Sequence, residues 1–174
     1  MRLLLTGTPG VGKTFLAKRL AEEFDLVYVD VNKIILQRKW FRVVAGEKEV
    51  DLRKLRGFLL RVLKKEKRVV IESHLLCEFF LPCDIVVLRC RPDVLFKRLS
   101  KRSYSLKKTS DNVLSEVLDY CVIKAEERYK NVFQVDNSKP LTVQKFFVYL
   151  KKKQVFDWRE WLLKERFIKQ LHIN

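Results

Sequence analysis

The chain has 174 residues, a length that suits one α/β domain. Hydrophobic residues make up 48% of it, and the low counts of 5 Gly and 4 Pro argue against long disordered stretches. The 37 Lys and Arg exceed the 21 Asp and Glu, so the formal net charge is +16. A polyanionic partner would explain this charge, and so would solvated helix ends or adaptation to heat.

No apolar run in the sequence approaches the roughly 20 residues that are needed to cross a membrane. The N-terminus also lacks the apolar core of a signal peptide. We therefore expect a soluble cytoplasmic protein, or a nuclear one in a eukaryote, with no membrane partner. The cysteines match neither a zinc site nor a redox pair, and we expect them to be free and buried: Cys77, Cys83, Cys90 and Cys121.

The first half of the chain alternates short apolar runs with patterns of helical period. In chain order it predicts a strand over residues 2–6, a helix over 13–24, a strand over 26–30, a helix over 32–40, a polar break over 46–49 and a helix that Asp51 caps. Leu16, Leu20 and Phe24 stand at i, i+4 and i+8, so the helix over 13–24 should bury one face.

The second half continues this alternation. In chain order it predicts strands over 68–72 and 84–89, a helix that begins at Pro92, a long helix that opens at Ser110 or Asp111, a strand over 131–136, and helices near 143–152 and 157–171. Strands that alternate with helices over this length predict an α/β fold, in which helices cover both faces of a five-stranded parallel sheet.

One motif identifies a ligand. Residues 7–14 read Gly-Thr-Pro-Gly-Val-Gly-Lys-Thr and match G-x-x-x-x-G-K-[ST] between a predicted strand and a predicted helix. Glycines in such a loop let backbone N–H groups approach the β-phosphate of a nucleotide. We expect Lys13 to reach the β- and γ-phosphates and Thr14 to place its hydroxyl on Mg²⁺. The sequence thus predicts one P-loop NTPase domain over residues 1–174, which binds Mg-ATP.

A carboxylate and a histidine follow the third predicted strand. Glu72 ends that strand, so it should lie at the carboxyl edge of the sheet, where open α/β sheets bind ligands. There it could hold Mg²⁺ through a water or activate an attacking water, and an ordinary exposed strand end is the alternative. His74 follows two residues later, where it could contact phosphate or water or simply fill a loop.

These motifs together resemble a known family, the adenylate-kinase-like ATPases of ribosome biogenesis, also called the adenylate kinase isoenzyme six family. The residues that carry the resemblance are the P-loop, the carboxylate-x-His pair Glu72-Ser73-His74, Arg102-x-Tyr104 with Lys107-Lys108 and Asp111-Asn112, and the turn over 137–140. The resemblance spans residues 1–140 and implies a P-loop fold of the nucleoside monophosphate kinase type.

The resemblance also implies an activity and partners. It implies a broad-specificity nucleoside monophosphate kinase, which converts ATP and AMP to two ADP, and which also hydrolyses ATP with Mg²⁺. It further implies a role in late maturation of the small ribosomal subunit and in pre-rRNA processing, through transient binding of a platform ribosomal protein, with rRNA or a pre-ribosomal particle as further partners. A purely metabolic adenylate kinase, or another small-molecule P-loop kinase, is the alternative.

Site residues carry over from the family position by position. The nucleotide-binding set is Gly7, Gly10, Val11, Gly12, Lys13, Thr14, Phe15 and Arg102. The catalytic set is Lys13, Glu72, His74 and Arg102, and the metal set is Thr14 and Glu72. An insert over 28–51, with Arg38, would receive the monophosphate, residues 101–111 would be the lid, and basic helices would occupy 143–171. Arg89 and Arg98 are further basic candidates for the site.

One departure from the family concerns the metal. The family pair is Asp-x-His, and this chain has Glu72 in the first position. The extra methylene moves the carboxylate by about 1.5 Å, so we expect Glu72 to reach Mg²⁺ through a bridging water.

Overall fold

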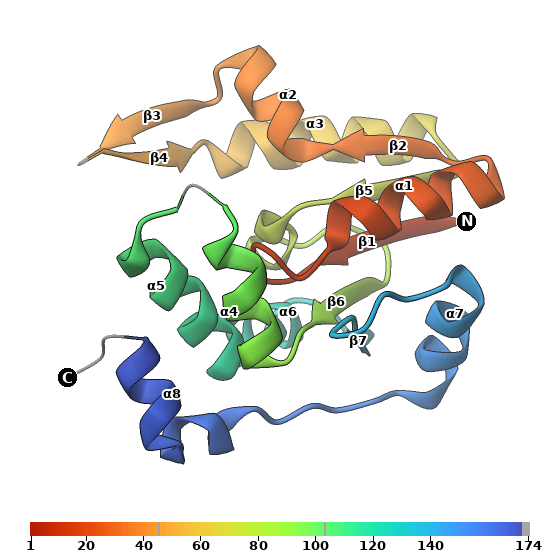
Figure 1. Cartoon of the computed structure of the whole chain (residues 1–174). Helices are drawn as coiled ribbons and strands as arrows, with labels where there is room; N and C mark the ends of the chain where they lie inside the picture. The colour runs from red at the N-terminus through yellow and green to blue at the C-terminus, as the bar shows by residue number, and fades with distance from the viewer. Residues whose placement is uncertain (45, 103, 172–174) are drawn as a thin grey trace.

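A five-stranded parallel sheet runs through the centre of the computed structural model, which describes residues 1–44, 46–102 and 104–171 (Figure 1). Its strands are β1 (Arg2–Thr6), β2 (Val27–Asp30), β5 (Val69–Glu72), β6 (Ile85–Arg89) and β7 (Val132–Asp136). They are ordered β2-β5-β1-β6-β7. Every residue of β5 and β6 is buried, as parallel strands covered on both faces require. The predicted five-stranded parallel sheet is confirmed.

Helices cover both faces of this sheet. They are α1 (Lys13–Phe24), α2 (Val31–Arg38), α3 (Leu52–Lys65), α4 (Pro92–Ser100), α5 (Leu106–Val117), α6 (Tyr120–Glu126), α7 (Val143–Lys152) and α8 (Glu165–Gln170), with short 3-10 turns η1 (His74–Glu78) and η2 (Arg159–Leu163). Within the described part of the chain, none of them is both long and apolar enough to cross a membrane.

The side chains of successive strand residues pack into two separate hydrophobic cores, one on each face of the sheet. Leu3 and Leu5 of β1 pack with residues of α1, α4, α5, α7 and α8, whereas Leu4 packs with residues of α2, α3, α6 and η1. This alternation follows from the two-residue period of a strand, which sends successive side chains to opposite faces. Of the cysteines, Cys77, Cys90 and Cys121 are buried as predicted, while Cys83 is half-buried.

The polar break predicted over residues 46–49 is wrong. β3 (Phe41–Val44) and β4 (Glu47–Val50) pair antiparallel in a hairpin, with Phe41 opposite Val50 and Arg42 opposite Glu49. Arg42 donates from Nε to Oε2 of Glu49 across the hairpin at 2.5 Å. The second strand is mostly charged, and its pairing with the first strand stabilises it, so its polar composition concealed it.

The long helix predicted to open at Ser110 or Asp111 is also wrong. α5 begins at Leu106, because the Ser105 hydroxyl accepts a hydrogen bond from the Lys108 amide at 3.2 Å and caps the helix. Asp119 then adopts a left-handed φ of 56° and separates α5 from α6. Aspartate tolerates this conformation better than most residues, so one continuous apolar pattern is divided between two helices.

The helix predicted over 157–171 is mostly absent, since η2 and the short α8 occupy that stretch. Asp157 accepts from the amide and from the guanidinium of Arg159, both at 2.9 Å, and this local turn replaces the start of a helix. The helices predicted after Asp51 and at Pro92 begin as expected, and the remaining predicted elements, including the helix over 143–152, have their ends within two residues of the predicted ones.

Candidate nucleotide-binding site

The P-loop connects the carboxyl end of β1 to the first residue of α1, Lys13. Gly7 has φ 131°, and a Cβ there would stand 2.3 Å from the carbonyl oxygen of Leu88 in the neighbouring strand β6. Gly12 has φ 103°, and a Cβ there would stand 2.4 Å from Nδ2 of Asn137. Both positions therefore require glycine, because positive φ and close approach to neighbouring atoms exclude a side chain.

Lys13 lies folded against the loop that precedes it. Its Nζ donates to the carbonyl oxygens of Gly7 at 2.7 Å and Thr8 at 3.1 Å, and the residue is only 8% exposed. Burial lowers the pKa of Lys13, and the carboxylates of Glu72 and Glu116 act against that shift. A buried ammonium on a flexible stem at this position can exchange loop carbonyls for phosphate oxygens.

Glu72 stands beside the P-loop. It ends β5, and it is in register with Leu5 of β1 on one side and Asp30 of β2 on the other. Its Oε1 accepts hydrogen bonds from the hydroxyl of Thr14 at 2.9 Å and the hydroxyl of Tyr28 at 3.2 Å. Glu72 is 2% exposed, so the alternative of an ordinary exposed strand end is excluded.

Tyr28 keeps its proton at this position. Burial and the adjacent Glu72 carboxylate together raise the pKa of Tyr28. Its hydroxyl is thus a hydrogen-bond donor that fixes the Glu72 carboxylate at neutral pH.

The paired oxygens of Thr14 and Glu72 fit a magnesium ion. Mg²⁺ prefers oxygen ligands and takes one or two from the protein, with the remainder from phosphates and water. Among the described residues, no group of three or more His, Cys, Asp or Glu side chains forms a closed metal site. Thr14 and Glu72 are accordingly the residues that would hold Mg²⁺ when a nucleotide brings it.

His74 begins η1 directly after the capping residue Ser73 and is half-buried. Burial lowers its pKa to about 4, with further contributions from the positive charges of Lys13 and Lys108. The imidazole is therefore neutral at pH 7.

Two arginines, one in α4 and one just after it, have different roles. Arg98 donates to the carbonyl oxygens of Asn137 at 2.9 Å and Ser138 at 3.0 Å, and to that of Val11 in the P-loop at 3.4 Å. It therefore supports the loop from behind. Arg102 follows α4, is exposed, and lies 5.9 Å from the ring centroid of Tyr104; its charge is one of those that lower the pKa of Lys13.

The predicted lid over residues 101–111 contains the start of a helix. Its second half belongs to α5, which begins at Leu106, while the described residues 101, 102, 104 and 105 lie outside helices and strands; Ser103 lies outside the described residues. Lys108 lies 5.1 Å from the ring centroid of Tyr104 on the first turn of that helix.

Two predicted binding residues are exposed. Arg38, at the end of α2, has its Cζ 5.2 Å from the ring centroid of Trp40 and 4.8 Å from that of Phe58. Phe15 is 59% exposed at the start of α1, and its ring contacts Arg19. The hydrogen bonds that join Lys13, Thr14 and Glu72 do not include either of them.

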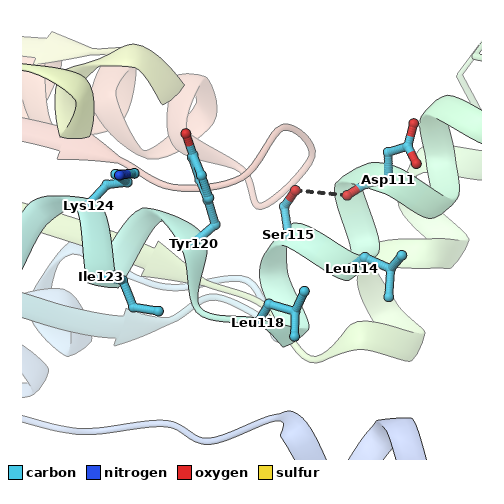
Figure 2. Close-up of a pocket in the computed structure, with 7 residues that line it drawn as sticks. All are labelled: Asp111, Leu114, Ser115, Leu118, Tyr120, Ile123 and Lys124. Atoms are coloured by element: carbon cyan, nitrogen blue, oxygen red, sulfur yellow. Dashed lines mark hydrogen bonds between the residues drawn. The ribbon is translucent and has the colours of Figure 1, made fainter.

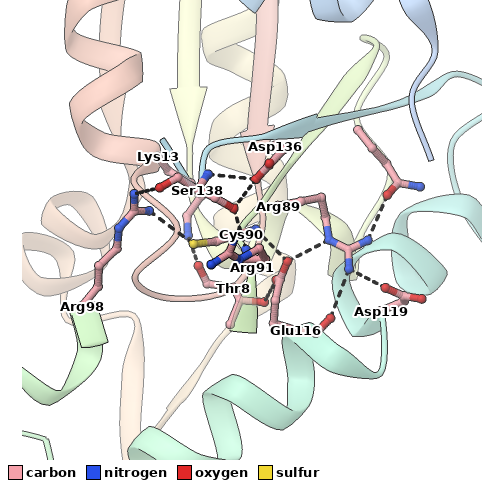
Figure 3. A network of polar contacts seen from close by, with 11 residues as sticks. Thr8, Lys13, Arg89, Cys90, Arg91, Arg98, Glu116, Asp119, Asp136 and Ser138 are labelled. Carbon is pink, nitrogen blue, oxygen red and sulfur yellow. Dashed lines mark hydrogen bonds and ion pairs between the residues drawn. The ribbon is translucent and has the colours of Figure 1, made fainter. Parts of the chain in front are cut away.

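Sequence reasoning missed a polar network behind the P-loop (Figure 3). Arg89, 1% exposed, donates from Nε to Oε1 of Glu116 at 2.8 Å and also binds Gln134 and Asp119. The other carboxylate oxygen of Glu116 accepts from the hydroxyl of Thr8 at 2.6 Å. Arg89 therefore serves this network, and its donors are not directed at a nucleotide.

A hollow of about 350 Å³ is lined by residues of α5, α6 and the turn between them (Figure 2). Leu114, Leu118 and Ile123 give it an apolar lining. Of its lining residues, Asp111 alone belongs to the predicted site, as the last residue of the predicted lid, so we do not assign the hollow to nucleotide binding.

Comparison with known proteins agrees with this geometry. A family model described as an AAA domain matches residues 3–119. A protein of Pyrococcus abyssi named "Putative adenylate kinase" is 40% identical over 139 residues, covering 79% of this chain and 76% of that protein. A Thermococcus onnurineus protein of the same name is 36% identical over 172 residues, covering 92% of each chain.

The chain belongs to this adenylate-kinase-like P-loop family. It is similar in fold to the shikimate kinase of Aquifex aeolicus, with a TM-score of 0.61 and 18% identity over 87% of this chain and 97% of that one. For the shikimate kinase of Bacteroides thetaiotaomicron, the TM-score is 0.53 and the sequence identity is 22%, over 87% of this chain and 95% of that one. The protein is thus a kinase-like P-loop enzyme that binds nucleotide.

Replacement of Lys13 tests the site directly. We expect Lys13→Ala to lower phosphoryl transfer and ATP hydrolysis by at least two to three orders of magnitude, because loss of a charge-stabilising group costs about 3–4 kcal/mol or more. Steady-state turnover measures the loss, and circular dichroism with thermal unfolding verifies the fold. Lys18→Ala, an exposed residue of the same helix, is the matched control. Near-normal turnover in folded Lys13→Ala would show that the site is misassigned.

The low pKa of His74 predicts a pH-dependent stability in the metal-free protein. The folded value of about 4 lies below the ordinary 6.5, so the unfolded chain binds the proton first as the pH falls. The neutral imidazole therefore contributes fully to the free energy of unfolding above pH 6.5. As the pH falls towards 4, the free energy of unfolding decreases by up to about 3 kcal/mol. We expect His74→Asn to remove this part of the pH dependence in urea unfolding. A constant difference between the two proteins from pH 7 to 4 would contradict the shifted pKa.

Proposed function

We propose that the protein is a nucleoside monophosphate kinase that transfers the γ-phosphoryl group of ATP to AMP and so produces two ADP. The observation that carries the proposal is the Thr14–Glu72 hydrogen bond beside the folded-back Lys13. It joins the P-loop to the carboxyl edge of the sheet, where a donor nucleotide and its metal would bind. The name of the archaeal relatives supports AMP as the acceptor.

Positioning and charge neutralisation supply most of the catalysis in phosphoryl transfer. Lys13 leaves the carbonyls of Gly7 and Thr8 and binds the β- and γ-phosphates. Thr14 and Glu72 would hold Mg²⁺, and the ion would neutralise charge on the phosphates. Arg102 is exposed on the predicted lid, from which it can close over the transferring group and help to exclude water.

The acceptor nucleotide would bind on the insert over residues 28–51. Arg38 stacks on Trp40 and Phe58 and so keeps its guanidinium at the surface beside the β3–β4 hairpin. An arginine whose flat face is supported by aromatic rings still presents its N–H groups to a phosphate. Arg38 is accordingly our candidate ligand of the monophosphate.

Measured turnover with different acceptors tests the proposal. The protein is supplied with Mg-ATP and each nucleoside monophosphate in turn, and with none, and products are separated by ion-exchange chromatography. We expect the fastest ADP formation with AMP. Equal ADP production with and without every monophosphate would reject the kinase proposal and leave an ATPase.

Hydrolysis of ATP is the second activity that we propose for the same site. An attacking water needs a base or a positioning group more than an attacking phosphate oxygen does. Glu72 and the neutral His74 are our candidates for that role. We therefore expect Glu72→Gln and His74→Ala each to lower hydrolysis about tenfold more than transfer to AMP. Tyr28→Phe, which removes a hydrogen bond to Glu72 but keeps the carboxylate, should leave the ratio of the two rates near that of the wild type. Equal losses of both rates in Glu72→Gln and His74→Ala would assign these residues to Mg²⁺ or to structure.

The charge favours a second role, in maturation of the small ribosomal subunit through a platform ribosomal protein and rRNA. The net charge of +16 far exceeds what one nucleotide site employs. Exposed basic residues gather along the C-terminal part of the chain: Lys145, Lys151, Lys152, Lys153, Arg159, Lys164, Arg166 and Lys169. Of these, Arg159, Lys164 and Lys169 pair with acidic neighbours. The strongest candidates for phosphate contacts are the other five: Lys145, Lys151, Lys152, Lys153 and Arg166.

Tryptophans on the same segment favour packing over base stacking. Trp161 lies edge-on against Phe167, with ring centroids 5.1 Å apart, and joins the core on the α1 side of the sheet. Trp158 stacks on Phe156 at 5.8 Å. We therefore assign RNA binding in this role to the basic side chains.

Binding that depends on phosphate contacts must weaken with salt. If about six phosphates are neutralised, affinity for small-subunit particles should fall roughly a thousandfold between 50 and 200 mM salt. Charge reversal of Lys151, Lys152 and Lys153 to Glu should reduce both the affinity and its salt dependence. The matched control reverses Lys64, Lys65 and Lys67 around the end of α3. Absence of association at 50 mM salt would leave the protein a purely metabolic kinase.

A further inference from the structure

Glu116 is a buried carboxylate that reaches the P-loop from a helix distant in sequence. It lies in the last turn of α5 and is 2% exposed. One carboxylate oxygen, Oε2, accepts a hydrogen bond from the hydroxyl of Thr8 at 2.6 Å. The other, Oε1, accepts hydrogen bonds from Nε of Arg89 at 2.8 Å and from the amide of Cys90 at 3.0 Å. Both oxygens are therefore engaged, one with the loop and one with the end of β6.

Arg89 fixes the orientation of this carboxylate. Besides Oε1, it binds the backbone carbonyl of Glu116 itself at 3.1 Å, Oε1 of Gln134 at 2.9 Å, and the carboxylate of Asp119. A guanidinium that donates to four acceptors cannot rotate freely, so the carboxylate that it binds has little freedom to rotate either. Figure 3 shows these groups converging from α5, β6 and the P-loop.

Thr8 is the residue through which this arrangement meets the phosphate site. It is 1% exposed, and its carbonyl oxygen accepts both Nζ of Lys13 at 3.1 Å and the amide of Val11 at 3.4 Å. Its hydroxyl and its carbonyl are thus fixed from opposite sides. Without the hydrogen bond to Glu116, Thr8, whose carbonyl binds Lys13, would be free of one of the contacts that fix its position.

We propose that Glu116 is a positioning residue for nucleotide binding, which holds the P-loop in its phosphate-binding conformation through the hydroxyl of Thr8. The charge-assisted bond orders the loop before the nucleotide arrives, so the nucleotide does not bear that entropic cost. The inference rests on the P-loop as the nucleotide site and is independent of the acceptor. It also connects the lid to the loop, since α5 begins directly after the lid.

Thr8 offers a test that leaves the buried ion pair intact. Thr8→Val keeps the shape of the side chain and removes the hydroxyl, whereas Thr8→Ser keeps the hydroxyl. We expect Thr8→Val to weaken Mg-ATP binding about 10- to 150-fold in titration calorimetry, the range for loss of a hydrogen bond to a charged group. Thr8→Ser should recover most of the affinity. The loss should appear mainly in KM, with kcat changed less, because the loop is ordered in the bound state of either variant.

A double-mutant cycle identifies Glu116 as the partner. Glu116→Gln should weaken binding in the wild-type background and add little in the Thr8→Val background. Tyr120→Phe, which removes a different hydroxyl–carboxylate hydrogen bond, that from Tyr120 to Oε1 of Glu78 at 2.9 Å, is the matched control and should leave nucleotide affinity within about twofold. If Glu116→Gln does not fold, the comparison of Thr8→Val with Thr8→Ser decides.

Three results would overturn the inference. They are unchanged affinity in Thr8→Val, no recovery in Thr8→Ser, or additive losses in the cycle. A wild-type protein that binds no nucleotide would instead refute the P-loop assignment on which the inference rests, so the two failures are distinguishable.

Discussion

The structure of the site depends on the buried ion pair between Arg89 and Glu116. Arg89 ends a central strand and Glu116 ends a helix on the far side of the lid, and both are almost fully excluded from water. A buried charge without a partner would cost about 3–5 kcal/mol, so neither residue is stable there alone. Their pairing obliges α5, β6 and the P-loop to meet at one point.

That meeting point lies where parallel strands end. All five strands of the sheet run the same way, so the groups that follow β1, β5 and β6 collect at a single edge. The P-loop follows β1, Glu72 ends β5, and Arg89 ends β6. The strands on either side of β1 thus serve the P-loop differently. Glu72 of β5 binds Thr14 on one side of the loop, and the Arg89–Glu116 pair at the end of β6 binds Thr8 on the other.

The elements around this edge differ in how firmly they are held. The P-loop is fixed by Asn137, whose Nδ2 donates to the Val11 carbonyl at 2.7 Å, by Arg98 and by Glu116. Arg38 and Arg102, by contrast, are exposed and contact aromatic rings on the surface. A firmly held P-loop and exposed arginines outside it are what our proposed kinase would use to bind one nucleotide in a preformed cradle and to close on the second.

The sequence by itself determined the elements whose signals are local. The P-loop, the apolar strands, the cap at Asp51 and the helix start at Pro92 depend on neighbouring residues, and the structure has each of them where the pattern indicates. Glu72 was identified because a strand end is visible in sequence. Only the tertiary structure decided the hairpin over 41–50, the break at Asp119 and the partnership of Thr8, Arg89 and Glu116. Thr8 and Glu116 are 108 positions apart, and the free energy of a buried hydrogen bond depends on the folded surroundings that bring its partners together, which no local pattern contains.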